Sequence, residues 1–239
     1  MSRRFHEDFP ITALLLLLVV GFFALELLGE SKFGDDPRAW GRVLHNLGAL
    51  DSRLVRGGEV WRLLSCAFLH GGLMHVFFSV WIIFDIGRFC EPLLSSPKFF
   101  TVYVLCGLGG STASLIWFVM QGGGVSVGAS GALFGLIGLL LVYAWKERHH
   151  ELKQSLLRWI GMILVVTVVL PFLSHIRVDH AAHAGGFVVG GLLGLTVKDY
   201  MTSSSARRWR LPSYAVGAVL GISLLLALYN YFSKLWELR

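Results

Sequence analysis

The chain has 239 residues, of which 55% are hydrophobic and only 15% are charged, and its mean hydropathy is +0.66. A soluble domain carries about 25% charged residues, so this composition excludes an ordinary water-soluble fold and predicts a protein embedded in a bilayer. The formal net charge of +6 does not indicate nucleic-acid binding, because the basic residues lie mostly in short segments between apolar runs.

Seven apolar runs approach the length of about 20 residues that a helix needs to cross a bilayer. They predict an all-α polytopic membrane protein with spans at Pro10–Leu28, Leu73–Leu94, Phe99–Met120, Ala129–Trp145, Leu157–Phe172, Ala181–Val197 and Pro212–Phe232. The first run follows Arg3 and Arg4 and could imitate a signal peptide. No small-residue cleavage site comes after it, so we interpret it as a retained helix.

The segments between the runs predict one domain with an appended helix. Residues 1–9 form a cytoplasmic N-terminus, 10–197 a six-helix core, 198–211 a cytoplasmic linker, and 212–239 the seventh helix with a short outside tail. The core includes a long first loop, residues 29–72, whose apolar residues lie among charges: Trp40, Leu44, Leu47, Leu50, Leu54 and Trp61. This pattern predicts a partly helical structure lying on the membrane, and a small extramembrane subdomain is the alternative.

Lys and Arg residues in the short loops set the predicted orientation. With a cytoplasmic N-terminus, the inner segments hold most of them: Arg3, Arg4, Arg88, Lys98, Lys146, Arg148, Lys153, Arg158, Lys198, Arg207, Arg208 and Arg210. The short outer segments hold Arg177, Lys234 and Arg239. The C-terminus is then outside. No organelle-targeting segment is evident, which favours a prokaryotic plasma (inner) membrane.

Polar side chains gather at the outer ends of three predicted helices. The start of the second helix carries His70, His75 and Ser79. Ser130 lies at the start of the fourth helix, and the start of the sixth carries Asp179, His180 and His183. A Ser hydroxyl becomes a nucleophile when a neutral His accepts its proton, so Ser130 and His183 predict a catalytic pair. The alternative is that Ser130 only caps a helix in a tightly packed bundle.

Glycine-lined faces would let the fourth and sixth helices approach closely. Gly131 and Gly135 are four residues apart on the fourth helix, and Gly186 and Gly190 on the sixth. Small residues at this spacing allow helix backbones to touch. We therefore expect these two helices to pack together with Ser130 facing His183.

Attack by Ser130 on an amide would also create an oxyanion. At a helix N-terminus, Ser130 offers its own backbone N–H within the positive end of the helix dipole. His75 and Ser79 are four residues apart, so they share a face of the second helix and could aim donors at the same point. The alternative for these two residues is hydrogen bonding between helices.

The segments HGGLMHVFFS, GASGALFG and AHAGG, preceded by EVWR, resemble the rhomboid intramembrane serine proteases. The resemblance runs from about Leu44 to Leu195 and implies a rhomboid-like six-helix bundle plus a C-terminal seventh transmembrane helix. It implies that Ser130 is the nucleophile and His183 its base. It also implies that His75 and the Ser130 backbone form the oxyanion hole.

Ser79 departs from the family pattern, which has Asn four residues after the second-helix His. A Ser hydroxyl can donate but is shorter than a carboxamide, and loss of one oxyanion donor typically costs about 10²–10³ in rate. We expect Ser79 to weaken catalysis, or to act through a water, without abolishing it. The resemblance also implies that Trp61 and Arg62 brace the first loop, whereas taken alone they indicate an interfacial anchor.

An acidic residue in or beside a span requires a partner in a membrane, and Asp179, Glu91 and Asp85 are examples. Asp179 precedes His183 by four residues, and either orients it as a third catalytic member or caps the sixth helix. Glu91 is expected to bond a neighbouring helix near the cytoplasmic interface. Asp85 lies nearer the middle of the membrane and could pair with a hydroxyl of the third helix, such as Ser111 or Ser114.

These observations predict a serine endopeptidase that cleaves membrane-anchored protein substrates near the outer face of the bilayer. A catalytically weak or silent relative that binds membrane-protein clients is the alternative, and Ser79 favours it. A transporter is a third class, which only the intramembrane Asp85 supports.

No metal, cofactor or nucleic acid is implied. A zinc site built from histidines at positions 70, 75, 180 and 183 would lack an HExxH motif and a supporting carboxylate. Cys66, Cys90 and Cys106 form no CxxC pair, so we expect small apolar residues and no disulfide.

Overall fold

The computed structural model describes residues 5–32, 36, 38–174, 178–196 and 203–237. Its elements follow in the order α1 (Phe5–Asp8), α2 (Pro10–Glu30), α3 (Ala39–Asn46), β1 (Leu50–Asp51), α4 (Ser52–Arg56), α5 (Arg62–Ser65), η1 (Cys66–Phe68, a 3-10 turn), α6 (Leu73–Leu94), α7 (Ser96–Met120), β2 (Val125–Ser126), α8 (Ser130–Lys146), α9 (His150–Ser174), α10 (His180–Thr196) and α11 (Ser203–Glu237). A helix lies over each predicted apolar run, apart from Ala129, which precedes α8, and Val197, which lies outside the described residues. This confirms the all-α polytopic fold class.

Within the described residues, four helices are long and apolar enough to cross a bilayer: α2, α6, α7 and the Ala206–Lys234 part of α11. The helices α8 and α10 are shorter, at 17 residues each. The neighbours α7, α9 and α10 cover α8, so most of its apolar side chains are buried in protein rather than exposed to lipid. The chain is therefore an integral membrane protein with a short helix at its centre.

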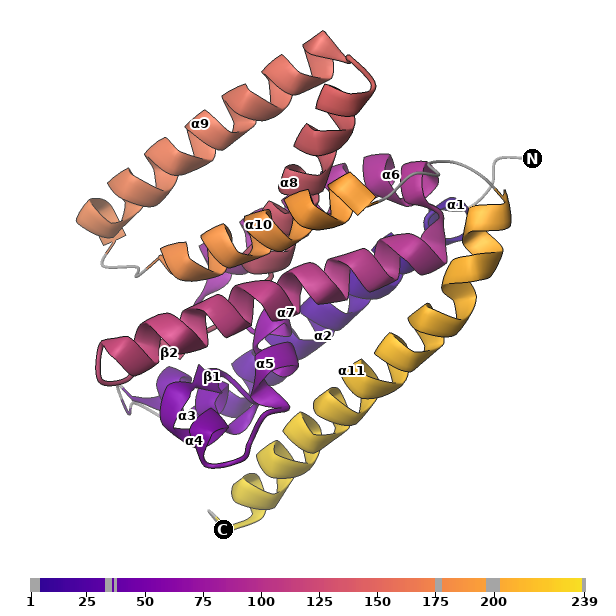
Figure 1. The fold of residues 1–239 in the computed structure, drawn as a ribbon. Coiled ribbons are helices and arrows are strands. Elements are labelled where there is room, and N and C mark those ends of the chain that lie inside the picture. Colours follow the sequence, from indigo (N-terminus) through magenta and orange to yellow (C-terminus); the bar gives the residue numbers. More distant parts are fainter. Residues whose placement is uncertain (1–4, 33–35, 37, 175–177, 197–202, 238–239) are drawn as a thin grey trace.

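Figure 1 shows how the helices are layered around α7. α10 lies between α9 and α7, and α8 crosses behind α10 before it turns into α9. On the other side of α7, α11 runs along the bundle and reaches the first loop beside α3 and α5. The seventh helix therefore contacts both the core and the loop.

α11 is longer than the predicted seventh helix. It begins at Ser203, so helix extends into the segment 198–211 that the sequence assigned to a linker, and Pro212 lies inside it rather than at its start. A run of serines favours a helix start, and a single Pro removes only one backbone hydrogen bond. The hydroxyl of Ser213 donates to the carbonyl oxygen of Arg210 at 2.7 Å and satisfies one acceptor of that turn.

The first loop is partly helical, as predicted, and it also pairs with a segment far along the chain. Strands β1 and β2 are antiparallel, with Leu50 opposite Ser126 and Asp51 opposite Val125. The hydroxyl of Ser52 extends this contact. It accepts a hydrogen bond at 3.1 Å from the backbone N–H of Gly124, the residue that precedes β2. Strands of two residues have no detectable period, so the sequence did not indicate this pairing.

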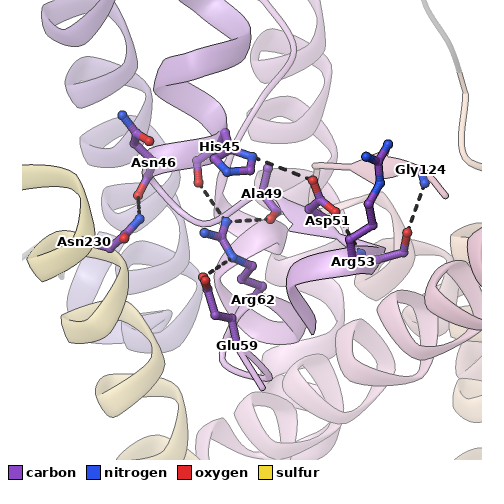
Figure 2. A network of polar contacts seen from close by, with 10 residues as sticks. His45, Asn46, Ala49, Asp51, Arg53, Glu59, Arg62, Gly124 and Asn230 are labelled. Carbon is purple, nitrogen blue, oxygen red and sulfur yellow. Dashed lines mark hydrogen bonds and ion pairs between the residues drawn. The ribbon is translucent and has the colours of Figure 1, made fainter. Parts of the chain in front are cut away.

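Arg62 is the centre of a polar network inside the first loop (Figure 2). Its guanidinium is fully buried, and its Nη1 donates to the carbonyl oxygens of His45 (2.7 Å) and Ala49 (3.0 Å). Its Nε donates to the carboxylate of Glu59 at 2.7 Å, and its guanidinium lies 4.6 Å from the centroid of the Trp61 ring. Arg62 therefore fastens α5 to the end of α3.

Glu91 confirms the expectation of a bond to a neighbouring helix. Its carboxylate accepts from the backbone N–H groups of Ile11 (2.9 Å) and Thr12 (2.8 Å) and from the Thr12 hydroxyl (2.7 Å). These amides belong to the first turn of α2 and have no partner within the helix, so Glu91 caps α2 from α6. The rest of the interior is mainly apolar and includes three buried, free cysteines, as predicted: Cys66, Cys90 and Cys106.

The suggested pairing of Asp85 with a third-helix hydroxyl is wrong. Ser111 donates to the carbonyl oxygen of Leu63 in the first loop, and Ser114 donates to Asp179 beside α10. Asp85 itself occupies an exposed position of α6. Both hydroxyls are therefore engaged by other elements that pack on α7.

Candidate active site

Ser130 is the first residue of α8. The residue before it, Ala129, occupies the N-cap position without a side-chain hydrogen bond. Gly128 has φ +126°, a left-handed conformation that glycine adopts without strain, and this turn leads the chain into the helix. Ser130 is therefore not the N-cap, and its hydroxyl lies at the start of α8.

His183 lies in the first turn of α10, opposite the start of α8. Its Nε2 is 2.9 Å from the Oγ of Ser130. This is the hydrogen-bond distance expected between a nucleophile and its base. If the Ser130 hydroxyl donates in this bond, Nε2 is the acceptor and the ring proton of His183 is on Nδ1.

The predicted glycine faces lie against each other and leave no room for side chains. A Cβ on Gly186 would overlap the carbonyl oxygen of Gly131, and a Cβ on Gly190 would overlap that of Gly135. The backbones of α8 and α10 therefore touch over more than one turn. This close approach brings the first turns of the two helices together.

Phe134 also positions His183, a role that the sequence did not indicate. Its ring stacks on the imidazole with centroids 4.1 Å apart and an interplanar angle of 13°. Phe134 follows Ser130 by four residues, so both side chains project from the same face of α8. That spacing was the available signal, but an apolar residue in an apolar helix does not stand out.

The imidazole of His75 lies beside the turn that precedes Ser130. Its Nδ1 accepts from the backbone N–H of Gly71 at 3.2 Å, so in the neutral ring Nε2 carries the proton. A Cβ built on Gly128 would lie only 2.8 Å from this Nε2. A donor N–H therefore lies close to the start of α8.

Ser79 is on the same helix as His75, one turn further from the helix start. Its side chain is buried, with 4% of its surface exposed. Because a Ser side chain is short, its hydroxyl reaches less far toward the helix mouth than a carboxamide would. Ser79 therefore lies further along α6 than His75, inside the bundle.

Asp179 caps α10. One carboxylate oxygen accepts from the backbone N–H of Ala182 at 2.9 Å, and the other accepts from the hydroxyl of Ser114. These contacts match the capping interpretation of Asp179. Both carboxylate oxygens are bonded to groups other than the His183 side chain.

His70 and His180 are the two remaining histidines that the sequence analysis placed at the outer ends of the helices. His70 is fully buried, and burial together with the neighbouring His75 lowers the pKa of His70 to about 3, so its ring is neutral near pH 7. The exposed His180 lies edge-on to His183, with centroids 6.1 Å apart. Within the described ranges, no cluster of three His, Cys, Asp or Glu side chains could hold a metal ion.

The first loop holds the segment that leads to Ser130. The backbone N–H of Gly128 donates to the carbonyl oxygen of Cys66 at 2.9 Å, and β1 pairs with β2 just upstream. Behind this segment is a cavity of about 20 Å³, roughly the size of one water molecule. Its lining includes the small polar residues Ser111, Ser114 and Ser126.

The fold and the site define a polytopic helical membrane protein with a Ser–His pair at the mouth of a helix interface. Comparison with known proteins agrees with this class. The family model for the rhomboid domain matches residues 57–200, which is more than half of the chain. The chain belongs to the rhomboid family.

The relatives include plant, bacterial and protozoan proteins. The chain is 42% identical over 158 residues to RHOMBOID-like protein 5 of Arabidopsis thaliana, a match that covers 65% of this chain and 50% of that protein. It is 31% identical over 177 residues to the Rhomboid protease GluP of Bacillus subtilis (strain 168), covering 73% and 32%. It is 30% identical over 156 residues to the Rhomboid-like protease 1 of Toxoplasma gondii, covering 64% and 52%. The matches thus span between about a third and a half of these relatives' own length.

Proposed function

We propose that this protein is an intramembrane serine endopeptidase that cleaves membrane-anchored proteins with a Ser130–His183 dyad. The observation that supports this most strongly is the 2.9 Å contact between Oγ of Ser130 and Nε2 of His183. Two relatives bear the name of protease, the Rhomboid protease GluP and the Rhomboid-like protease 1. Both facts favour a hydrolase that acts on peptide bonds.

The first half of the reaction forms an acyl-enzyme. Oγ of Ser130 attacks the carbonyl carbon of the substrate peptide while Nε2 of His183 takes the hydroxyl proton. The C–N bond then breaks, and the imidazolium gives this proton to the leaving amine. Phe134 keeps the imidazole in the plane that this exchange requires, because it stacks on one face of the ring.

Two donors stabilise the oxyanion that forms during attack. One is the backbone N–H of Ser130, which belongs to the first turn of α8 and has no acceptor within the helix. The other is Nε2–H of His75, whose tautomer is set by the Gly71 amide on the opposite ring nitrogen. Donors fixed in place before the charge develops lower the barrier most.

The second half of the reaction releases the acyl group. Water loses a proton to His183 and attacks the ester, and the proton returns to Ser130 as the ester bond breaks. No metal or cofactor takes part in these steps as proposed. Substrates are transmembrane proteins, and a helical substrate has to unwind locally before its carbonyl reaches Ser130.

We further propose that the N-terminus is cytoplasmic and that Ser130 faces the outside, in a prokaryotic plasma membrane. The distribution of Lys and Arg along the loops supports this orientation. A membrane-impermeant thiol reagent applied to intact cells tests it. The reagent should modify Lys234→Cys and leave Arg207→Cys unmodified, since the native cysteines are buried. The reverse pattern would invert the proposed topology.

A serine-directed fluorophosphonate tests the dyad. The wild-type protein should label, Ser130→Ala should not label, and His183→Ala should label at least 100-fold more slowly because the hydroxyl loses its base. Ser223→Ala is the matched control, since this hydroxyl is on α11 and donates to the carbonyl oxygen of Val219 in the same helix. Labelling that persists in Ser130→Ala, or its absence from folded wild-type protein, would refute the proposal.

A catalytically weak or silent relative that binds membrane-protein clients is a second candidate, and the Ser79 side chain favours it. If a missing carboxamide limits the rate, Ser79→Asn should raise the labelling rate and the turnover of a cleavable transmembrane peptide. A gain of tenfold or more would mean that the Ser79 side chain limits the catalytic rate of the native protein. An unchanged or lower rate would show that Ser79 is not what limits catalysis.

A further inference from the structure

Glu26 is a buried acidic residue that the reaction above does not use. It lies near the end of α2, and its side chain is fully buried. A carboxyl group inside a membrane protein is costly, and such residues usually have a functional or structural partner. Glu26 Oε1 accepts from the backbone N–H of His70 at 2.9 Å, across 44 positions of sequence. Its Oε2 is buried without a hydrogen-bond partner among the residues that the structure describes.

The amide that Glu26 holds belongs to a short link between the first loop and α6. This link, residues 69–72, follows η1 and precedes Leu73, the first residue of α6. Gly72 has φ +143°, a conformation that favours glycine, and residues 69–72 lie outside the helical elements on either side. A buried amide left unpaired costs about 1–3 kcal/mol, so an acceptor from α2 stabilises this particular path of the link.

The link in turn sets the position of His75. The next amide along the chain, the N–H of Gly71, donates to Nδ1 of His75 at 3.2 Å. The ring of His70 lies edge-on to the ring of His75, with centroids 4.9 Å apart and an interplanar angle of 71°. His75 is therefore oriented by two consecutive residues of the link, through a backbone donor and through a ring contact.

The ring of His70 has no other evident role. It is fully buried, and neither ring nitrogen has a hydrogen-bond partner within the described part of the chain. Its contact with His75 is therefore steric, and its position follows from the backbone that Glu26 holds. This arrangement keeps Nδ1 of His75 as an acceptor and leaves the proton on Nε2, the nitrogen beside Gly128.

We propose that Glu26 is a positioning residue for His75: its carboxyl holds the His70 amide, and the link 69–72 then fixes the ring and the tautomer of His75. The oxyanion donor is thereby controlled from α2, a helix that contributes no group to the Ser130–His183 pair. This inference rests on the proposed function, in which Nε2–H of His75 binds the oxyanion.

Glu91 supplies a matched control. It too is a buried carboxylate that accepts from backbone N–H groups of another segment, but it lies on α6 and caps Ile11 and Thr12 at the opposite end of α2. Replacing either glutamate by Leu removes a buried acceptor of backbone N–H groups. Only Glu26 is connected to the link that precedes His75, so only its loss should change the chemistry of the site.

The rate of fluorophosphonate labelling reports on positioning, because the phosphoryl oxygen of the probe needs the oxyanion donors. Glu26→Leu should slow labelling about tenfold, less than the 10²–10³ expected for loss of a donor itself. Glu26→Gln keeps a carbonyl acceptor and should restore most of the rate. Glu91→Leu should lower the thermal midpoint while the folded protein labels at the wild-type rate.

A double-mutant cycle separates positioning from a general loss of structure. If Glu26 acts through His75, then Glu26→Leu should have no further effect in a His75→Ala background. Equal losses in both backgrounds would overturn the proposal. So would a Glu26→Leu protein that folds and labels like the wild type.

The tautomer of His75 gives a readout that does not depend on activity. With ¹⁵N-labelled histidine, and with the signals of His75 assigned by their loss in His75→Ala, the wild type should show a protonated Nε2 and an unprotonated Nδ1. Glu26→Leu should show both tautomers, and an unchanged tautomer would refute the inference. If the wild-type protein fails to label at all, the proposed function fails, and this measurement still decides the role of Glu26.

Discussion

Two regions of the molecule hold the Ser130 segment in opposite ways. Across the α8–α10 interface, backbone lies directly on backbone, with Gly186 against Gly131 and Gly190 against Gly135. In the first loop, by contrast, side chains bond backbone carbonyls, and the buried guanidinium of Arg62 is the main example (Figure 2). One region depends on the absence of side chains, and the other on the reach of a long one.

The difference follows from the surroundings of each region. Apolar helices gain little from hiding their surfaces from lipid, so close van der Waals contact between small residues holds them together. The loop has irregular backbone whose carbonyl groups are buried and need donors. Added side-chain volume should therefore disrupt the helix interface, whereas removal of a hydrogen bond should destabilise the loop.

The largest expected effect is that of Gly190→Ala. The new methyl group would overlap the carbonyl oxygen of Gly135, and because that atom is backbone, the helices have to separate. Overpacking costs about 1–3 kcal/mol or more, and the Ser130–His183 contact would lengthen. We expect labelling by the fluorophosphonate to fall at least 100-fold.

The adjacent Gly191→Ala is its control, because a Cβ there would meet only Val142 at an ordinary contact distance of 4.0 Å. It should label and melt like the wild type. Equal damage from the two substitutions would mean that the interface is sensitive to helix composition rather than to volume.

Arg62→Leu should have the next largest effect, by the opposite mechanism. It adds no volume but leaves two buried carbonyl oxygens without their donor, at about 1–3 kcal/mol each. We expect a thermal midpoint several degrees lower and labelling slowed about tenfold. The exposed Arg56→Leu should change neither quantity. If Arg62→Leu melts like the wild type, hydrogen bonding does not hold this loop.

A smaller effect is expected from Asn230→Leu, which tests whether the loop is also fastened by the seventh helix. The Asn230 side chain donates to the carbonyl oxygen of Asn46 at 2.7 Å, as Figure 2 shows. Loss of one such bond costs about 0.5–1.5 kcal/mol. Thermal unfolding should shift slightly downward, with the labelling rate within twofold of wild type. Tyr229→Leu, at an exposed position next to it, should leave both unchanged.

The smallest expected effect is a pH dependence confined to the loop. Burial of His45 lowers its pKa below the usual 6.5, and the positive charges of Arg62 and Lys234 lower it further. The unfolded chain then binds a proton at His45 below pH 6.5, while the folded chain does not until a lower pH. The free energy of unfolding therefore decreases as the pH falls through this window.

His45→Gln removes that group, so the thermal midpoint of the variant should fall less between pH 7 and pH 5 than that of the wild type. Parallel decreases would show that His45 does not contribute to the acid sensitivity. Gly191→Ala adds or removes no titratable group, so it should follow the wild-type curve.

The contacts of single acidic residues show how far sequence patterns reach. The sequence predicted that Glu91 bonds a neighbouring helix and allowed Asp179 as a helix cap, and the structure contains both contacts. It suggested a third-helix hydroxyl for Asp85, and this was wrong because those hydroxyls bond other elements. A pattern indicates that a buried charge needs a partner, but the partner depends on which helices become neighbours.

The sequence by itself determined the all-α polytopic class of the protein and placed helices over its apolar runs, and it predicted that Ser130 and His183 lie together. These follow from local properties: hydropathy over about 20 residues, and glycines four residues apart. Only the tertiary structure decided that Phe134 stacks on His183, that β1 pairs with β2, and that Glu26 holds the amide of His70. Each of these contacts joins a side chain or a short strand to a partner that no period or motif specifies. They form because packed helices and a folded loop bring those groups within bonding distance.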